Sequence, residues 1–305
     1  MKNVYVLIFV FFNYSAVAQS NLLNAKNPDD ITNTISVKDT DNFLDYEDID
    51  EKDILWSKIV YELIDLDQKL NHPFLFPLND EENFIERKSL WRSIKEIIKE
   101  KLEYKPDDSL HNSLPPEKLS IYKDDKFTSK LSRKEIYNLI WYPRFNRKEN
   151  KTEELSIQSG SVGSYEIKGV WYFDKKHSEL RYRLLGIHAR TASIADLKND
   201  VTDPDLNADS GLWIWYPSIR EELDKSLVFN ERNNNSKISF DELLINRRFD
   251  SYIYKYDNVY GNREIEQYIV RRDGETDERL KLRRILESER IKKEILDFEI
   301  DMWGY

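Results

Sequence analysis

Two alternating segments on either side of residues 174–177 constrain the fold more than any other feature of this chain. The first, residues 165–173, ends in the run Val170-Trp171-Tyr172-Phe173. The second, residues 178–187, alternates apolar with basic side chains. Alternation at period two buries one face of a strand and leaves the other in water. The two segments and the polar run between them therefore predict an antiparallel hairpin.

Helical spacing of apolar residues predicts two helices before this hairpin. The first is expected to start at Asp50 or Asp53 and to continue to Leu70. The run Asn71-His72-Pro73 is expected to end it, because proline disfavours helix in the residue before it. The second helix is expected over residues 83–102, with leucine, isoleucine and tryptophan on one stripe.

Capping-box sequences predict three further helix starts. These starts pair Ser132 with Glu135, Ser218 with Glu221, and Ser239 with Glu242. Short strands are expected at residues 119–122 and 212–216, and loops at residues 104–118 and 148–154. Residues 277–303 predict a long charged helix with one stripe toward the core. The stripe residues are Ile285, Ser288, Ile291, Ile295, Phe298 and Met302. The predicted fold class is α+β, an antiparallel sheet flanked by helices.

The composition excludes several classes of protein. The 305 residues carry a net charge of −10 and include no cysteine. An acidic chain lacks the basic face that nucleic-acid phosphates need, so no nucleic-acid partner is expected. Without cysteine there is no disulfide framework, no thiolate metal site and no cysteine for a lipid anchor. Hydrophobic residues make up 40% of the chain, which predicts a packed core.

The N-terminal residues predict an export signal followed by an acidic arm. A positive start, the apolar run at residues 4–12 and Ala16-Val17-Ala18 are typical of a signal peptide over residues 1–18. The apolar run is shorter than the ~20 residues of a membrane-spanning helix. Residues 19–50 are rich in Asp, Asn, Thr and Ser, which predicts a disordered or loosely docked linker. The folded domain is expected over residues 51–305.

A series of short blocks, in order along the chain, carries a resemblance to a known family. The blocks are Asp53-Ile54-Leu55-Trp56-Ser57-Lys58, Ile64-Asp65-Leu66, Asn71-His72-Pro73, Trp171-Tyr172-Phe173-Asp174-Lys175-Lys176, Leu184-Leu185-Gly186-Ile187, Leu212-Trp213-Ile214-Trp215-Tyr216-Pro217, Val228-Phe229-Asn230, Ser239-Phe240-Asp241, Arg248-Phe249, Ser251-Tyr252-Ile253-Tyr254-Lys255 and Asp301-Met302-Trp303. Together they resemble the GldN (PorN) family of gliding-motility and type IX secretion proteins. The resemblance covers the chain from about residue 51 onward.

This resemblance implies a non-enzymatic periplasmic subunit of the type IX secretion system. It implies a homo-oligomeric ring that assembles with an outer-membrane lipoprotein of the GldK or PorK type. It also implies coupling to an inner-membrane motor that contains GldL and GldM (PorM). A protein of this kind would support protein secretion and gliding motility. It would associate with the outer membrane only through the lipoprotein, with no direct membrane insertion and no cofactor.

Residues 203–209 form a polar run that opens like a calcium-binding loop. The oxygen-bearing residues at alternate positions are Asp203, Asp205, Asn207 and Asp209. Hard cations such as calcium prefer carboxylate and carbonyl oxygens at this spacing. However, Ala208 stands where the loop needs glycine, and Ile214 stands where the closing glutamate belongs. The run favours an acidic surface loop, with a calcium-dependent periplasmic binding module as an alternative.

Catalytic chemistry is predicted only weakly. The four histidines are His72, His111, His177 and His188. No two of them stand three or four residues apart, so no pair of metal ligands is predicted on one helix face. A periplasmic hydrolase remains as a second alternative. It would require dispersed carboxylates to converge in an enclosed cleft, with their pKa values pushed apart.

The preferred partner-contact patch lies near residue 250. Tyr252, Tyr254 and Tyr256 are expected to share one face of a strand, and Arg247 and Arg248 come just before it. Tyrosine and arginine are favoured at protein interfaces, where they often supply most of the binding energy. The sequence therefore predicts a protein contact through these five residues.

Overall fold

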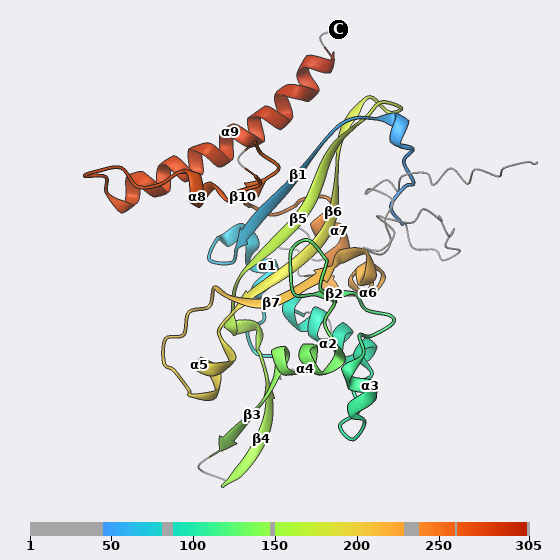
Figure 1. Ribbon diagram of the computed structural model, residues 1–305, viewed down its shortest axis with the longest axis vertical. Coiled ribbons are helices and arrows are strands. Elements are labelled where there is room, and N and C mark those ends of the chain that lie inside the picture. The colour runs from blue at the N-terminus through green and yellow to red at the C-terminus, as the bar shows by residue number, and fades with distance from the viewer. Residues whose placement is uncertain (1–44, 81–87, 147–149, 229–237, 260, 304–305) are drawn as a thin grey trace, which may run out of the picture.

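The computed structural model describes residues 45–80, 88–146, 150–228, 238–259 and 261–303. The predicted signal peptide, most of the predicted acidic linker and the start of the predicted 83–102 helix lie outside these residues. The described part is an α+β fold with a large antiparallel sheet and a long C-terminal helix (Figure 1), so the predicted fold class is confirmed.

The main sheet is antiparallel and has the strand order β10-β1-β5-β6-β7-β2. Its strands are β1 (Ile54–Asp65), β2 (Ile121–Tyr122), β5 (Val162–Asp174), β6 (Glu179–Thr191), β7 (Ala208–Trp215) and β10 (Tyr252–Tyr256). The predicted hairpin is confirmed as β5 and β6, but the prediction that one of its faces lies in water is wrong, because both faces are covered. In its turn, the carboxylate of Asp174 accepts hydrogen bonds from the backbone N–H groups of Lys176 and His177. Two small sheets pair β3 (Trp141–Asn146) with β4 (Lys151–Ser156), and β8 (Leu227–Val228) with β9 (Ile238–Ser239).

The helices lie on one face of the sheet and at its ends. They are α1 (His72–Leu75), α2 (Leu90–Leu102), α3 (Ser109–Ser113), α4 (Arg133–Ile140), α5 (Ile194–Lys198), α6 (Arg220–Lys225), α7 (Phe240–Ile245), α8 (Ile265–Tyr268) and α9 (Asp277–Trp303). Short 3₁₀ turns are η3 (Glu51–Asp53), η4 (Lys69–Asn71), η5 (Ser159–Ser161) and η6 (Tyr216–Ser218). Figure 1 shows α9 at one end of the molecule and the β3–β4 hairpin at the other. Within the described ranges, none of the helices combines the length and apolar character needed to cross a bilayer.

The prediction of a helix up to Leu70 is wrong, because this segment is strand β1. Val60, Tyr61 and Glu62 are all buried although they follow one another, so both faces of β1 are covered. A strand buried on both faces loses the alternation that distinguishes it from a helix. Pro73 does not end a helix either. It lies in the first turn of α1, where its missing N–H group costs nothing.

The predicted helix starts are confirmed at two of three serines. Ser132 forms the full capping box with Glu135, and Ser239 accepts a hydrogen bond from the backbone of Glu242. The Ser218 prediction is wrong, because its hydroxyl donates to the Trp215 carbonyl and α6 starts only at Arg220. Ser218 ends the 3₁₀ turn η6, and Ile219 stands at the N-cap position of α6, so Ser218 lies one residue too early to cap this helix.

Other boundaries also differ from the predictions. The helix expected over residues 83–102 starts at Leu90, because Ser89 caps it by accepting a hydrogen bond from Arg92. The loop predicted over residues 104–118 contains the short helix α3. The loop predicted over residues 148–154 contains the start of β4, whose mostly polar, exposed residues gave no strand pattern.

The sheet has a hydrophobic core on each face. The first face packs on α2, α4, α6 and α7, and its large buried residues include Trp91, Tyr165, Tyr216 and Phe240. Toward one end of the sheet, α9 covers the strands, and its residues Ile291 and Ile295 pack on Val60 and Ile253. The second face carries an aromatic cluster that includes Tyr61, Phe127, Trp213 and Trp215. Successive residues of a strand point to opposite faces, so Glu166, Lys168 and His188 lie on this second face.

Candidate functional site

Charged side chains from three neighbouring strands gather on the second face of the sheet. We call Glu166, His188, Arg190 and Asp209 the charged cluster. Strand pairing places Glu166 of β5 opposite His188 of β6, and Arg190 of β6 opposite Asp209 of β7. Glu166 is 5% exposed and His188 is 1% exposed, so two ionisable groups are almost removed from water. Burial of this kind, with specific charge partners, is the usual signature of a candidate site.

His188 lies at the centre of the charged cluster. Its Nδ1 is 3.1 Å from Oε2 of Glu166, and its Nε2 is 3.1 Å from Oδ1 of Asp209. The Ser210 hydroxyl lies 3.0 Å from the same Nε2. The imidazole also stacks on the Trp213 ring, with 5.0 Å between ring centroids. A serine, a histidine and a carboxylate in this order resemble the catalytic arrangement of a serine hydrolase.

The electrostatics of the cluster do not suit that chemistry. Burial favours neutral His188, but its hydrogen bonds to Asp209 and Glu166 outweigh burial and raise the pKa of the imidazole. The raised pKa favours the protonated imidazole, which is the form that cannot accept the proton of a nucleophilic serine. The Ser210 hydroxyl donates instead to the Ala189 carbonyl at 2.7 Å. We therefore assign the cluster a structural role, in which His188 of β6 bridges carboxylates on the two strands that flank it, β5 and β7.

Glu166 and Lys168 extend this network along β5. Burial opposes ionisation of Glu166, but His188 and Arg190 outweigh it and lower the pKa of the carboxyl. The Arg190 Nε donates to Glu166 at 2.6 Å. Burial lowers the pKa of Lys168 to about 8. The ammonium of Lys168 donates to the Asp125 carbonyl at 2.7 Å and lies 4.8 Å from the Phe127 ring centroid.

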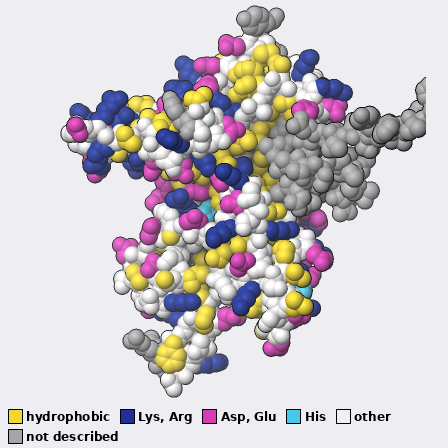
Figure 2. Space-filling model, in the orientation of Figure 1, with side chains coloured by type: hydrophobic (Ala, Val, Ile, Leu, Met, Phe, Trp, Pro, Cys, Tyr) yellow, Lys and Arg dark blue, Asp and Glu magenta, His cyan; other side chains and the backbone are white. Residues whose placement is uncertain are grey.

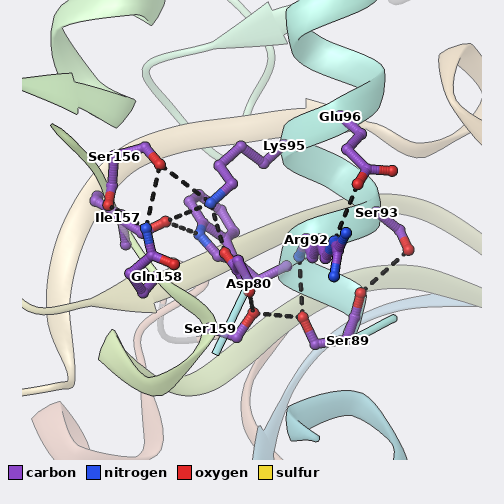
Figure 3. Close-up of polar contacts among 11 residues, drawn as sticks. Asp80, Ser89, Arg92, Ser93, Lys95, Glu96, Ser156, Ile157, Gln158 and Ser159 are labelled. Atoms are coloured by element: carbon purple, nitrogen blue, oxygen red, sulfur yellow. Dashed lines mark hydrogen bonds and ion pairs between the residues drawn. The ribbon is translucent and has the colours of Figure 1, made fainter. Parts of the chain in front are cut away.

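A second group of polar side chains lies at the N-terminus of α2 (Figure 3). The Ser89 and Ser159 hydroxyls are 2.5 Å apart, and the Ser159 hydroxyl donates to Asp80. Lys95 forms an ion pair with Asp80 at 2.5 Å and donates to the Ile157 carbonyl at 3.0 Å. The lysine is paired with a carboxylate and so is no base for either serine. These contacts fasten the N-terminus of α2 to the segment before β5.

A cavity of about 480 Å³ lies where the end of the predicted acidic linker meets the sheet. The Tyr46 hydroxyl donates to the Leu184 carbonyl at 3.0 Å, and the Arg220 guanidinium lies 4.0 Å from the Tyr46 ring centroid. The Glu47 carboxylate pairs with Arg181 at 2.8 Å. This last part of the linker is therefore docked on arginine side chains, as charge complementarity and cation–π attraction favour.

The structure separates the arginines and tyrosines predicted as a contact patch. Tyr256 is 7% exposed and packs in the cluster that contains Ile291 of α9. Tyr254 packs instead beside Tyr61 on the second face, and Tyr252 is 39% exposed. The expectation that the three tyrosines share one face is therefore wrong. An irregularity in the β1–β10 register, between Tyr61 and Glu62, shifts the alternation.

The two arginines of the predicted patch have opposite surroundings. Arg247 lies in the interior, where its guanidinium pairs with Glu62 at 2.6 Å. Arg248 is half exposed and lies 3.4 Å from Glu242. The exposed members of the predicted patch are thus Arg248 and Tyr252.

The structure brings three of the four predicted calcium ligands to one surface depression but places the fourth, Asp209, against His188. The Asp205 carboxylate accepts a hydrogen bond from the Asn207 backbone at 2.9 Å, and the Asn207 side-chain oxygen accepts one from Ser164 at 2.7 Å. Asp209 binds His188, as described above. Asp203, Asp205 and Asn207 line one surface depression together with Asp67. Across the described ranges, no group of three or more His, Asp or Glu side chains is arranged to hold a metal ion.

Sequence reasoning missed the charged cluster because its members lie far apart in the chain. The available signal was the position of Glu166 and Lys168, which alternate with buried Tyr165 and Ile167 in the predicted hairpin. The register that places His188 opposite Glu166 cannot be read from either strand alone.

Comparison with known proteins identifies the family. The sequence profile described as "Gliding motility associated protein GldN" matches residues 49–304. No curated protein matches the sequence significantly. The matched region includes the whole main sheet and α9. The chain therefore belongs to the GldN family, whose members take part in gliding motility and type IX secretion.

Proposed function

We propose that this protein is a non-enzymatic periplasmic ring subunit of the type IX secretion system. Its partners would be further copies of itself, a GldK-like or PorK-like outer-membrane lipoprotein and a GldM-like or PorM-like motor protein. The observation that carries the proposal is the family match across residues 49–304. Membrane association would come through the lipoprotein, and the role would serve both secretion and gliding.

The chemistry of the described residues supports an assembly role. In both groups of polar side chains that resemble catalytic arrangements, the key side chains are already bound to one another. His188 is held between two carboxylates, and Lys95 is paired with Asp80. In each case the side chain that would act as the base is already held by a carboxylate. The hydrolase alternative therefore gains no support from these two groups.

The surface also supports an assembly role. A closed ring requires a heterologous contact, in which two different surfaces of one subunit meet between neighbours. Large apolar side chains are exposed on separate parts of the molecule, including Leu110 of α3, Phe145 of β3 and Leu286 of α9. Figure 2 shows hydrophobic side chains exposed among lysines and arginines in the region of α8 and α9. Each specific contact should bury on the order of 1,000 Å².

We assign the contact with the lipoprotein to the surface around Arg248 and Tyr252. Both side chains are exposed, and both residue types are favoured at interfaces. The test is to co-express the chain with its lipoprotein and measure how much of it sediments with outer membranes. Retention should require the lipoprotein and should fall severalfold in the Tyr252→Ala/Arg248→Ala variant. Leu110→Ala is the matched control, since Leu110 is 79% exposed on a different surface. Equal retention without the lipoprotein would contradict the proposed attachment.

A further inference from the structure

The long helix α9 has apolar side chains on two opposite faces. One face packs on the sheet through Ser288, Ile291 and Ile295, which are at most 2% exposed. On the opposite face Leu282, Leu286, Leu296 and Ile300 are 54%, 58%, 52% and 66% exposed. A surface helix in a monomer normally carries polar residues on its outer face. We call this second face the outer stripe.

The outer stripe follows the spacing of a coiled coil. Its six positions are Leu282, Leu286, Glu289, Lys293, Leu296 and Ile300, at alternating steps of four and three residues. That spacing is the a and d pattern of a heptad repeat, which faces a second helix along a seam. Glu289 and Lys293 are exposed as well, so all six side chains are accessible.

The outer stripe is symmetric about residue 291. Leu282 and Ile300 lie nine residues to either side of it, Leu286 and Leu296 lie five, and Glu289 and Lys293 lie two. In an antiparallel pair centred here, Leu286 faces Leu296 of the second copy and Leu282 faces Ile300 of the second copy. Glu289 then faces Lys293 of the second copy. The apolar layers therefore match, and the two central polar layers each join opposite charges.

The charges along α9 also favour an antiparallel partner. Its last ten residues contain Glu294, Asp297, Glu299 and Asp301 but no Lys or Arg, whereas residues 279–284 contain Arg279, Lys281, Arg283 and Arg284. Acids at a helix C-terminus oppose the helix dipole, so stability of the isolated helix does not explain this order. In the antiparallel pair, Arg283, which pairs with Glu275 of its own chain at 2.9 Å, lies near Asp297 of the second copy on the flank of the seam. A parallel pair would place the basic halves together.

The centre of the pair brings Arg290 close to Arg290 of the second copy. This arginine is already neutralised on its own helix, because it pairs with Glu287 at 2.8 Å and with Glu294 at 3.1 Å. The like charges at the two-fold axis are therefore compensated before the helices meet.

We infer that the outer stripe of α9 binds the same stripe of a second copy of this chain in an antiparallel, two-fold symmetric contact. The contact does not rest on the ring proposed above. An isologous contact of this kind joins subunits in pairs, whereas a ring needs a separate heterologous surface. A helix pair of this length falls among small interfaces, so the dimer should form reversibly as concentration rises.

Cross-linking tests the register. The chain has no cysteine, so introduced thiols are the only ones that react. Leu286→Cys and Leu296→Cys variants are mixed and treated with a short bismaleimide. The mixture should give a covalent dimer. Each variant alone should not, because equivalent residues lie ten positions, or about 15 Å, apart along the axis. Leu110→Cys mixed with Leu286→Cys is the control for random collisions.

A charge exchange tests the polar layer by sedimentation velocity. Glu289→Lys places lysine opposite lysine and should weaken dimerisation about tenfold. The double variant Glu289→Lys/Lys293→Glu restores opposite charges and should restore dimerisation. Both positions are exposed, so the unfolding temperature checks that each variant remains folded. A chain that stays monomeric at all concentrations, or cross-links that form equally in single variants, would overturn the inference. If the chain stays monomeric, the partner of the outer stripe would instead be a helix of another protein.

Discussion

Glu62 and Arg247 are 185 residues apart in sequence, and their side chains lie 2.6 Å apart in the interior of the fold. Glu62 is 1% exposed, and Ser251 donates a second hydrogen bond to the same carboxylate oxygen at 2.5 Å. The Arg247 guanidinium lies 4.3 Å from the Tyr182 ring centroid. The pair therefore fastens the segment before the edge strand β10 onto β1.

Removing one partner of this pair should destabilise the protein strongly. Arg247→Ala leaves the Glu62 carboxylate buried without its cation, which costs about 3–5 kcal/mol in other proteins. Urea unfolding measures the loss. The neighbouring Arg248 is the matched control, because its pair with Glu242 is half exposed. Arg248→Ala should cost less than about 1 kcal/mol. An equal loss of unfolding free energy in the two variants would show that the pair of Arg247 with Glu62 contributes no more to stability than the exposed pair.

The charged cluster should make stability depend on pH. Although burial opposes the charge, Asp209 and Glu166 raise the pKa of His188 above its ordinary value. A histidine whose pKa is higher in the folded state than in the unfolded state contributes to stability. This contribution is complete below the unfolded pKa of about 6.5 and is lost as the pH rises through the folded pKa. The free energy of unfolding of the unchanged protein should therefore exceed that of the His188→Gln variant at acidic pH. The difference between the two free energies should shrink as the pH rises above neutrality. A difference that is constant from about pH 5.5 to about pH 9 would contradict this account.

Gly169 is required by close packing within the hairpin. A Cβ atom at this position would lie 2.2 Å from the Tyr182 ring, which is held in the core beside Trp171. Gly169→Ala should therefore cost about 1–3 kcal/mol, as over-packing does elsewhere. Gly160→Ala is the control, because its Cβ would meet no atom closer than 3.7 Å. Thermal unfolding of the two variants gives the comparison, and an unchanged Gly169→Ala variant would refute the packing argument.

Calcium should leave the stability of the protein unchanged. A ligand that binds only the folded state raises the unfolding temperature by mass action. Two of the four expected ligands, Asn207 and Asp209, are already bound to Ser164 and His188. Melting curves with and without millimolar calcium test this. A rise that disappears in the Asp203→Ala/Asp205→Ala variant would instead establish the calcium-binding alternative.

The sequence predicts the parts of this fold in which polar residues mark the period of the element or its ends. The β5–β6 hairpin is covered on both faces, but the polar run at residues 174–177 separates its strands, and polar residues such as Glu166 and Lys168 keep the period of two visible. Helix α9 keeps charged residues around its buried stripe, so the period of 3.6 is visible there. Strand β1 is covered on both faces, and its apolar residues also satisfy helical spacing. The remaining signal was its content of β-branched and aromatic residues, including Ile59, Val60 and Tyr61.

The side-chain clusters depend on contacts that no local pattern contains. Arg247 and Arg248 are adjacent and identical in type, but one is paired inside the fold and the other lies at the surface. The register irregularity between β1 and β10 decides which tyrosines share a face. Both outcomes depend on tertiary pairing. The sequence therefore indicates these residues as a group but does not show which of them are buried and which are exposed.

If this protein acts as an assembling subunit, electron microscopy of the chain purified together with its GldK-like lipoprotein should show closed rings that contain many copies of both proteins. Particles that contain a single copy of this chain, with or without the lipoprotein, would contradict this role.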